Sequence, residues 1–93
     1  MKYEIIITST FKKELKIIKK RNKNLQKLTQ IVNKLANGEE LESKYRDHQL
    51  TDNHRFKNCR ECHIEPDWLL VYKKNNQELI LFLIETGTHS DLF

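Results

Sequence analysis

The segment "ELILFLIET", residues 78–86, is the sequence feature that most restricts how this chain can fold. Its apolar side chains occupy both faces of an extended chain, so both faces need cover from other parts of the protein. Such a strand belongs inside a sheet, away from the edge. The apolar run "LILFLI" has the length of a strand and is much shorter than the ~20 residues of a membrane span.

Two amphipathic helices are expected to cover this sheet. The β-branched segment 2–8, "KYEIIIT", predicts a strand, and Ser9 or Thr10 can cap the helix that follows it. A second helix is predicted to begin near Asn24 and to end before Gly38, a residue type that favours the C′ position. The short link between them indicates a helical hairpin with apolar stripes that need a sheet.

The second half of the chain predicts three further strands. They fall in "RFKNCRECHIE", "WLLVYK" and "ELILFLIET", and an irregular connection, residues 38–54, precedes them. The predicted fold is therefore α+β in one domain, residues 1–93. An N-terminal strand and a helical hairpin are followed by three C-terminal strands, in a mainly antiparallel sheet of four strands.

The positive charge of the chain is unevenly distributed. Residues 1–34 hold ten Lys and Arg against two acids (+8), and residues 35–93 hold seven against eleven (−4), which gives the net charge of +4. A lysine-dense half suggests an anionic partner such as nucleic acid, although a solvated helix face gives the same pattern. The candidate contacts share one face of the first helix: Lys12, Lys16, Lys19 and Lys23. Without a membrane span or a signal peptide, the expected location is the cytoplasm.

The segment "CRECH" matches the attachment pattern of c-type haem. Haem is attached outside the cytoplasm, and Arg60 and Glu61 do not suit an apolar haem pocket. Zinc is the better alternative, with Cys59, Cys62, His63 and one of His48, His54 or His89 as ligands. Two cysteines three apart on a strand point to opposite faces, however. We therefore expect Cys62 to be buried and Cys59 to be incidental.

Three histidines and one aspartate are candidates for chemistry at one end of the sheet: His48, His63, His89 and Asp67. Cleavage of RNA by its own 2′-hydroxyl needs a base for that hydroxyl and an acid for the leaving 5′-oxygen. Histidine can serve in either role near neutral pH. Asp67 can act as the base or orient a histidine. Trp68 and Phe93 offer flat faces on which unstacked bases can lie, or they hold the shape of the site.

The sequence also resembles a known family in three stretches: "YRDHQL" at 45–50, "RECHIEPDWLLVYK" at 60–73 and "TGTHSDLF" at 86–93. Together they are similar to the YafQ-like branch of the RelE/ParE toxin superfamily. The resemblance implies a metal-independent endoribonuclease, without a cofactor, that cuts mRNA in the ribosomal A site and leaves a 2′,3′-cyclic phosphate. The active-site residues it implies are His48, His63, Asp67, Trp68, His89 and Phe93.

The same resemblance implies partners. A cognate antitoxin, DinJ- or RelB-like, would block the toxin and, together with it, repress the shared operon. The toxin itself would contact the ribosome and mRNA. It would reach operator DNA only through the antitoxin and would have no membrane partner.

One position departs from the family pattern. Related toxins often carry an arginine directly before the "TGTH" stretch, and this chain has Glu85. A carboxylate there repels a phosphate. Three alternatives are open: Arg46, Arg55, Lys57 or Arg60 supplies the positive charge, the activity of this protein is weak, or the Glu85 side chain turns away from the site. Two other interpretations of the chain remain at this point: a non-catalytic RNA- or ribosome-binding module with the same fold, and a small zinc-binding protein.

Overall fold

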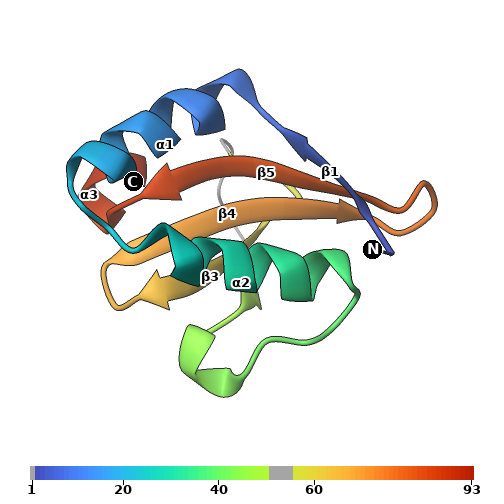
Figure 1. The fold of residues 1–93 in the computed structure, drawn as a ribbon. Helices are drawn as coiled ribbons and strands as arrows, with labels where there is room; N and C mark the ends of the chain where they lie inside the picture. Colours follow the sequence, from blue (N-terminus) through green and yellow to red (C-terminus); the bar gives the residue numbers. More distant parts are fainter. Residues whose placement is uncertain (1, 51–55) are drawn as a thin grey trace.

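The computed structural model describes residues 2–50 and 56–93 of the 93-residue chain (Figure 1). His54 and Arg55, considered above as a zinc ligand and a cation, lie outside the described residues. The elements follow in the order β1 (Glu4–Ile7), α1 (Ser9–Lys20), α2 (Leu25–Ala36), the 3₁₀ helix η1 (Ser43–Tyr45), β2 (His48–Gln49), β3 (Arg60–Glu65), β4 (Trp68–Asn75), β5 (Ile80–Gly87) and α3 (His89–Leu92).

The strands form one sheet in the order β1-β5-β4-β3-β2. β1 pairs with β5 in parallel, and the other pairs are antiparallel. The prediction that β5 lies inside the sheet is confirmed, because β1 and β4 flank it. The prediction of four strands was one short. β2 lies in the segment predicted as irregular, and its two residues pair with Arg60 and Glu61.

The helical hairpin begins and ends close to the predicted residues. The N-cap of α1 is Thr8, one residue before the predicted caps, and its Oγ1 accepts a hydrogen bond from Phe11 N at 2.9 Å. Asn24 caps α2 as predicted. Gly38 follows the end of α2 with a φ of +79°, a conformation that favours glycine because it lacks a Cβ.

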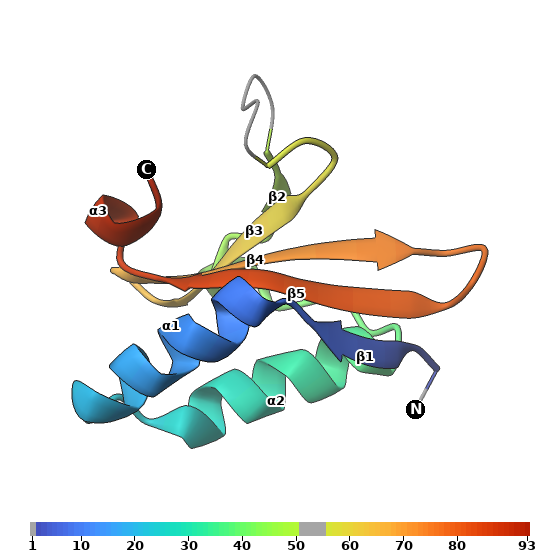
Figure 2. The ribbon, with the colours of Figure 1, turned by 90° about the horizontal axis from the view of Figure 1, so that it is seen from above.

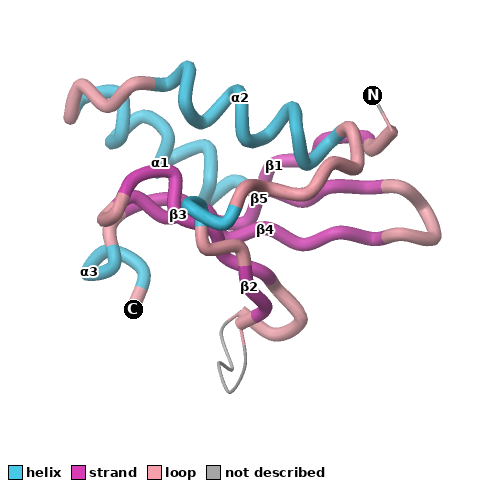
Figure 3. The backbone as a smooth tube through the Cα atoms, turned by 90° about the horizontal axis from the view of Figure 1, so that it is seen from below, coloured by secondary structure: helices cyan, strands magenta, loops and turns pink. Residues whose placement is uncertain are grey.

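The two long helices lie side by side on one face of the sheet, and α3 lies on the opposite face (Figures 2 and 3). The main core fills the space between the long helices and the sheet, and includes Phe11, Ile18, Leu35, Leu70 and Leu81. A smaller cluster on the other face joins α3 to the sheet: Phe56, Cys59, Leu69, Val71 and Leu92. The helix-free part of that second face is where a site can form.

Candidate active site

A carboxylate lies between two imidazoles on the face of the sheet opposite α1 and α2. His48 on β2 stands opposite Glu61 on β3, and His63 lies two residues after Glu61, so the alternation of the strand directs all three to one face. Glu61 Oε1 is 3.7 Å from His48 Nε2 and 3.5 Å from His63 Nε2. The Glu61 side chain is only 5% exposed. Sequence reasoning missed Glu61, although its spacing from His63 was the available signal.

Backbone carbonyls fix the orientation of both rings. His48 Nδ1 is 2.7 Å from Arg46 O, and His63 Nδ1 is 3.2 Å from Pro66 O. Because a carbonyl oxygen only accepts, each Nδ1 carries the proton and each Nε2 faces Glu61. A second proton, taken up on either Nε2, would lie next to the Glu61 carboxylate. From this position a proton can pass to a substrate or be taken from it.

The turn between β3 and β4 joins this cluster to the C-terminal helix. Pro66 O contacts His63, and Asp67 Oδ1 accepts a hydrogen bond from His89 N at 3.2 Å. Of the two roles considered for Asp67, this contact supports positioning of a histidine. The turn around the single proline therefore holds His63 through one residue and His89 through the next.

The C-terminal phenylalanine packs beside His89. The ring centroids of His89 and Phe93 are 5.0 Å apart, and Phe93 meets the buried ring of Phe56 edge-on at 5.5 Å. Phe93 is nevertheless 47% exposed. One part of the ring is thus held by the protein while another part faces solvent, which suits a surface on which a base can stack.

The prediction that Trp68 offers a face to a base is wrong in this structure. Its side chain is fully buried in the main core, on the helix side of the sheet. Trp68 Nε1 donates to Thr86 Oγ1 at 3.0 Å, and Thr86 Oγ1 donates to Leu69 O at 2.7 Å. Trp68 can hold the strands behind the site in place, which was the other role considered for it.

The prediction that Arg60 contacts substrate is also wrong here. Arg60 lies one residue before Glu61, so its side chain points to the helix side of the sheet, where Nε is 3.3 Å from Asp47 Oδ1. The hydroxyl of Tyr72 donates to the same oxygen, and burial raises the pKa of that hydroxyl. Lys57 is exposed in the turn before β3, and its substrate role stays a prediction.

Glu85 is on the same face as the histidine cluster. It stands opposite Val71, and Val71 stands opposite Glu61 in the neighbouring pair of strands. The residue is only 5% exposed. Glu85 is therefore enclosed by the protein on the face that carries the histidines and does not turn into solvent.

The lysine face of α1 is shorter than predicted. Lys12, Lys16 and Lys19 are exposed on the helix. Lys23 lies beyond the end of α1 at Lys20, and its Nζ is 3.2 Å from Glu65 Oε1. The helix ends before its fourth predicted member, so Lys23 belongs to an ion pair with the sheet.

The two thiols are free and belong to different clusters. Cys62 lies in the main core and Cys59 in the smaller cluster, so the prediction that Cys59 is incidental was wrong. Burial raises the pKa of both thiols. Because the two clusters lie on opposite faces of the sheet, the two sulfur atoms do not converge on one ion. Within residues 2–50 and 56–93, no group of three or more His, Cys, Asp or Glu side chains is arranged to hold a metal.

Comparison with known proteins decides the family. Residues 3–93 match the family described as "Bacterial toxin of type II toxin-antitoxin system, YafQ". The chain belongs to the YafQ family of type II toxins. The mRNA interferase toxin YafQ of Escherichia coli K12 is 35% identical over 91 residues, which span 97% of this chain and 95% of that protein.

Solved structures of bacterial toxins share the fold over nearly the whole chain. A metal-bound toxin from Helicobacter pylori superposes with a TM-score of 0.90 at 43% identity and covers 98% of this chain and 99% of its own. The matching chain in the crystal structure of the E. coli DinJ–YafQ complex superposes with a TM-score of 0.87 at 36% identity, and the match covers 98% of both chains. The resemblance to YafQ-like toxins noted from the three sequence motifs is therefore confirmed.

Proposed function

We propose that this YafQ-family protein is the toxin of a type II toxin–antitoxin pair and an endoribonuclease that cleaves mRNA in the ribosomal A site. The cluster of His48, Glu61 and His63 on the helix-free face, with His89 held by the adjoining turn, is the observation that carries this proposal. The names of the E. coli relatives, mRNA interferase toxin YafQ, support the same activity.

In the proposed reaction the ribose 2′-oxygen attacks the neighbouring phosphorus atom. One imidazole accepts the 2′-hydroxyl proton as the O2′–P bond forms, and a second group donates a proton to O5′ as the P–O5′ bond breaks. The products are a 2′,3′-cyclic phosphate and a 5′-hydroxyl. His48, Glu61, His63 and His89 share the proton transfers, Asp67 positions His89, and Phe93 stacks a base. None of these steps calls for a metal ion.

The partners follow from the family and from the charge of the helices. A DinJ-like antitoxin would bind the toxin, in line with the solved DinJ–YafQ complexes. It would thereby block the toxin and link it to operator DNA. Exposed Lys12, Lys16 and Lys19 on α1 would contact ribosomal phosphates without reading sequence. We place these encounters in the cytoplasm. In the described part of the chain, no helix is long and apolar enough to cross a membrane.

Mapping of RNA ends on programmed ribosomes tests the activity. The wild-type protein should create new ends within the A-site codon, with a cyclic phosphate on the upstream fragment. His63→Ala and His89→Ala should each lose on the order of 100-fold or more in single-turnover rate. Growth arrest on expression, relieved by the co-expressed antitoxin, should accompany cleavage. Full activity of both alanine variants would contradict the proposed site.

One observation supports a second candidate function. The buried carboxylate of Glu85, on the face that carries the histidines, disfavours a phosphate nearby and suits a module that binds the ribosome without cleaving mRNA. In that case the protein would sediment with ribosomes and inhibit translation while the mRNA ends stayed unchanged. Metal analysis of the purified protein and of the Cys59→Ser/Cys62→Ser variant separates both functions from a zinc-binding role.

A further inference from the structure

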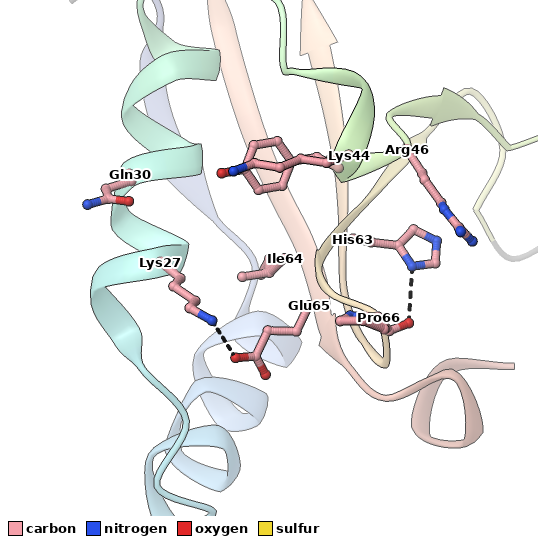
Figure 4. Close-up of a pocket in the computed structure, with 9 residues that line it drawn as sticks. Lys27, Gln30, Lys44, Arg46, His63, Ile64, Glu65 and Pro66 are labelled. Carbon is pink, nitrogen blue, oxygen red and sulfur yellow. Dashed lines mark hydrogen bonds and ion pairs between the residues drawn. The ribbon is translucent and has the colours of Figure 1, made fainter.

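A groove of about 480 Å³ opens beside the histidine cluster, between α2, η1 and the end of β3 (Figure 4). Its size falls within the usual range of small-ligand sites. Its walls come from three elements: Lys27 and Gln30 of α2, Lys44, Tyr45 and Arg46 at η1, and His63, Ile64, Glu65 and Pro66 at the end of β3. His63 belongs both to this groove and to the candidate active site.

The groove favours an anion. Neither Lys44 nor Arg46 has a carboxylate oxygen within 4.0 Å among the described residues. Among the described residues that line the groove, Glu65 is the one acid, and two ammonium groups already bind it: Lys27 Nζ at 2.9 Å and Lys23 Nζ at 3.2 Å. These contacts lower the pKa of Glu65. The positive charges on the opposite wall are therefore available to a ligand.

The groove also presents a flat and apolar lining. Tyr45 is half-buried against the main core, with Lys44 Nζ 5.1 Å from its ring centroid. Ile64 and Pro66 add apolar surface. An aromatic ring flanked by cations is the combination that binds single-stranded nucleic acid, through base stacking together with phosphate contacts.

Arg46 connects the groove to the active site through its backbone. It has a left-handed conformation, with φ 49° and ψ 44°, which a non-glycine residue seldom adopts. Its carbonyl oxygen is the partner of His48 Nδ1 at 2.7 Å, and its side chain lines the groove. One residue thus orients a histidine of the site and supplies a charge to the neighbouring groove.

We propose that this groove is a second nucleotide-binding subsite, which holds the nucleotide next to the cleaved bond with its phosphate at Lys44 and Arg46 and its base against Tyr45. The proposal rests on the proposed ribonuclease activity and extends it. An acidic segment of a protein partner fits the charge as well, but His63 is shared with the site of cleavage, and this favours RNA.

Single-turnover cleavage on programmed ribosomes tests the subsite with a matched control. The Lys44→Gln/Arg46→Gln variant removes two charges and no buried contact. Lys73→Gln/Lys74→Gln removes two charges from β4, outside the groove. The groove variant should raise the protein concentration needed for half-maximal rate about tenfold or more, with the maximal rate within twofold. The control variant should change either quantity less than twofold.

A second arm tests the base. Tyr45→Ala should weaken binding of an intact mRNA. An abasic nucleotide placed directly 5′ or directly 3′ of the cleaved bond should abolish that difference at one of the two positions. The position at which Tyr45→Ala no longer weakens binding identifies the nucleotide in the groove. A lower melting temperature of Tyr45→Ala would weaken binding at both positions alike, so it cannot produce this result.

The outcomes separate the two proposals. If the wild-type protein cleaves mRNA and the groove variant matches its control, the subsite is wrong and the proposed activity stands. A groove variant that loses affinity for the antitoxin while it cleaves normally would assign the groove to an acidic protein segment and overturn the RNA subsite. If the wild-type protein does not cleave, both proposals fail.

Discussion

Replacement of Asp91 by alanine should impair cleavage by releasing the C-terminal helix that carries His89. Asp91 Oδ2 accepts hydrogen bonds from Thr88 N at 2.9 Å and from Arg21 Nη1 at 2.7 Å, and Asp91 N donates to Thr88 Oγ1 at 3.2 Å. This capping box begins a helix of only four residues. The contact with Arg21 ties that helix to the end of α1.

The size of the effect follows from the cap. Loss of a capping side chain costs about 1 kcal/mol, with a range up to about 2. A cost of 1.4 kcal/mol lowers an equilibrium constant tenfold, so the ratio of docked to undocked α3 should fall roughly tenfold. Loss of the exposed Arg21 contact acts in the same direction. Burial of Leu92 against the sheet opposes release, and the global melting temperature should therefore change little.

Single-turnover cleavage and histidine NMR measure this release. The maximal rate of Asp91→Ala should fall with the docked fraction of α3, by at most roughly tenfold, and the mutual shifts of the His89 and Phe93 ring signals should decrease by the same fraction. Ser90→Ala, an exposed neighbour in the same helix, should behave as wild type. Arg21→Gln leaves the capping box in place and should lose less than Asp91→Ala. Equal rates for Asp91→Ala and Ser90→Ala would refute the reasoning.

The same tether should respond to acid. The hydrogen bond from Arg21, followed by that from Thr88 N, lowers the pKa of Asp91 from 3.8 to about 2. Because the pKa in the docked state is the lower one, the contribution of the carboxylate is complete above pH 4. It is lost as the pH falls from about 4 to 2. The His89 and Phe93 ring contact, followed by NMR, should weaken over that interval in the wild type and remain flat in Asp91→Ala.

Three further predictions address other parts of the molecule. Glu61→Gln keeps the shape of the side chain and removes its charge. Single-turnover cleavage should therefore fall at least about tenfold, and the pH–rate profile should change shape. An unchanged profile would assign Glu61 a packing role only. Changing Lys12, Lys16 and Lys19 to glutamine should weaken ribosome association and flatten its dependence on salt at an unchanged maximal rate; an unchanged salt slope would make α1 a solvated face. Phe93→Ala should cut cleavage at least about tenfold with little change in melting temperature, while Phe93→Trp should retain most activity, and wild-type cleavage by Phe93→Ala would leave the ring without a role.

The regular elements were predictable because periodicity and capping residues encode them locally. Asn24 and Gly38 mark the ends of α2 in the sequence, and the doubly apolar β5 lies inside the sheet as predicted. β2 could not be predicted, because two residues carry no periodicity. His48 and Gln49 are extended only because β3, distant in sequence, offers them an edge.

The site was predictable in part. The errors concern which face of the sheet a strand residue points to. His63 and Asp67 were placed correctly at one turn, because proline marks that turn in the sequence. Trp68 was misassigned because β4 is apolar on both faces and gives no signal of which face meets the helices. The sequence-based prediction included Arg60 and omitted Glu61. The alternation of side chains along the strand that carries His63 already places Glu61, and not Arg60, on the same face as His63.

The positions of the basic residues restrict which positive charges can lie close to the histidine cluster. Glu85 occupies the strand position where related toxins often have an arginine, and Arg60 is held by Asp47 on the far face. Of the described candidates, Arg46 has the most direct link to the histidines, since its carbonyl orients His48 while its side chain lines the adjoining groove. Positive charge near the histidines therefore enters from the groove side, and a substrate that leaves the groove empty should lose affinity while the maximal rate hardly changes.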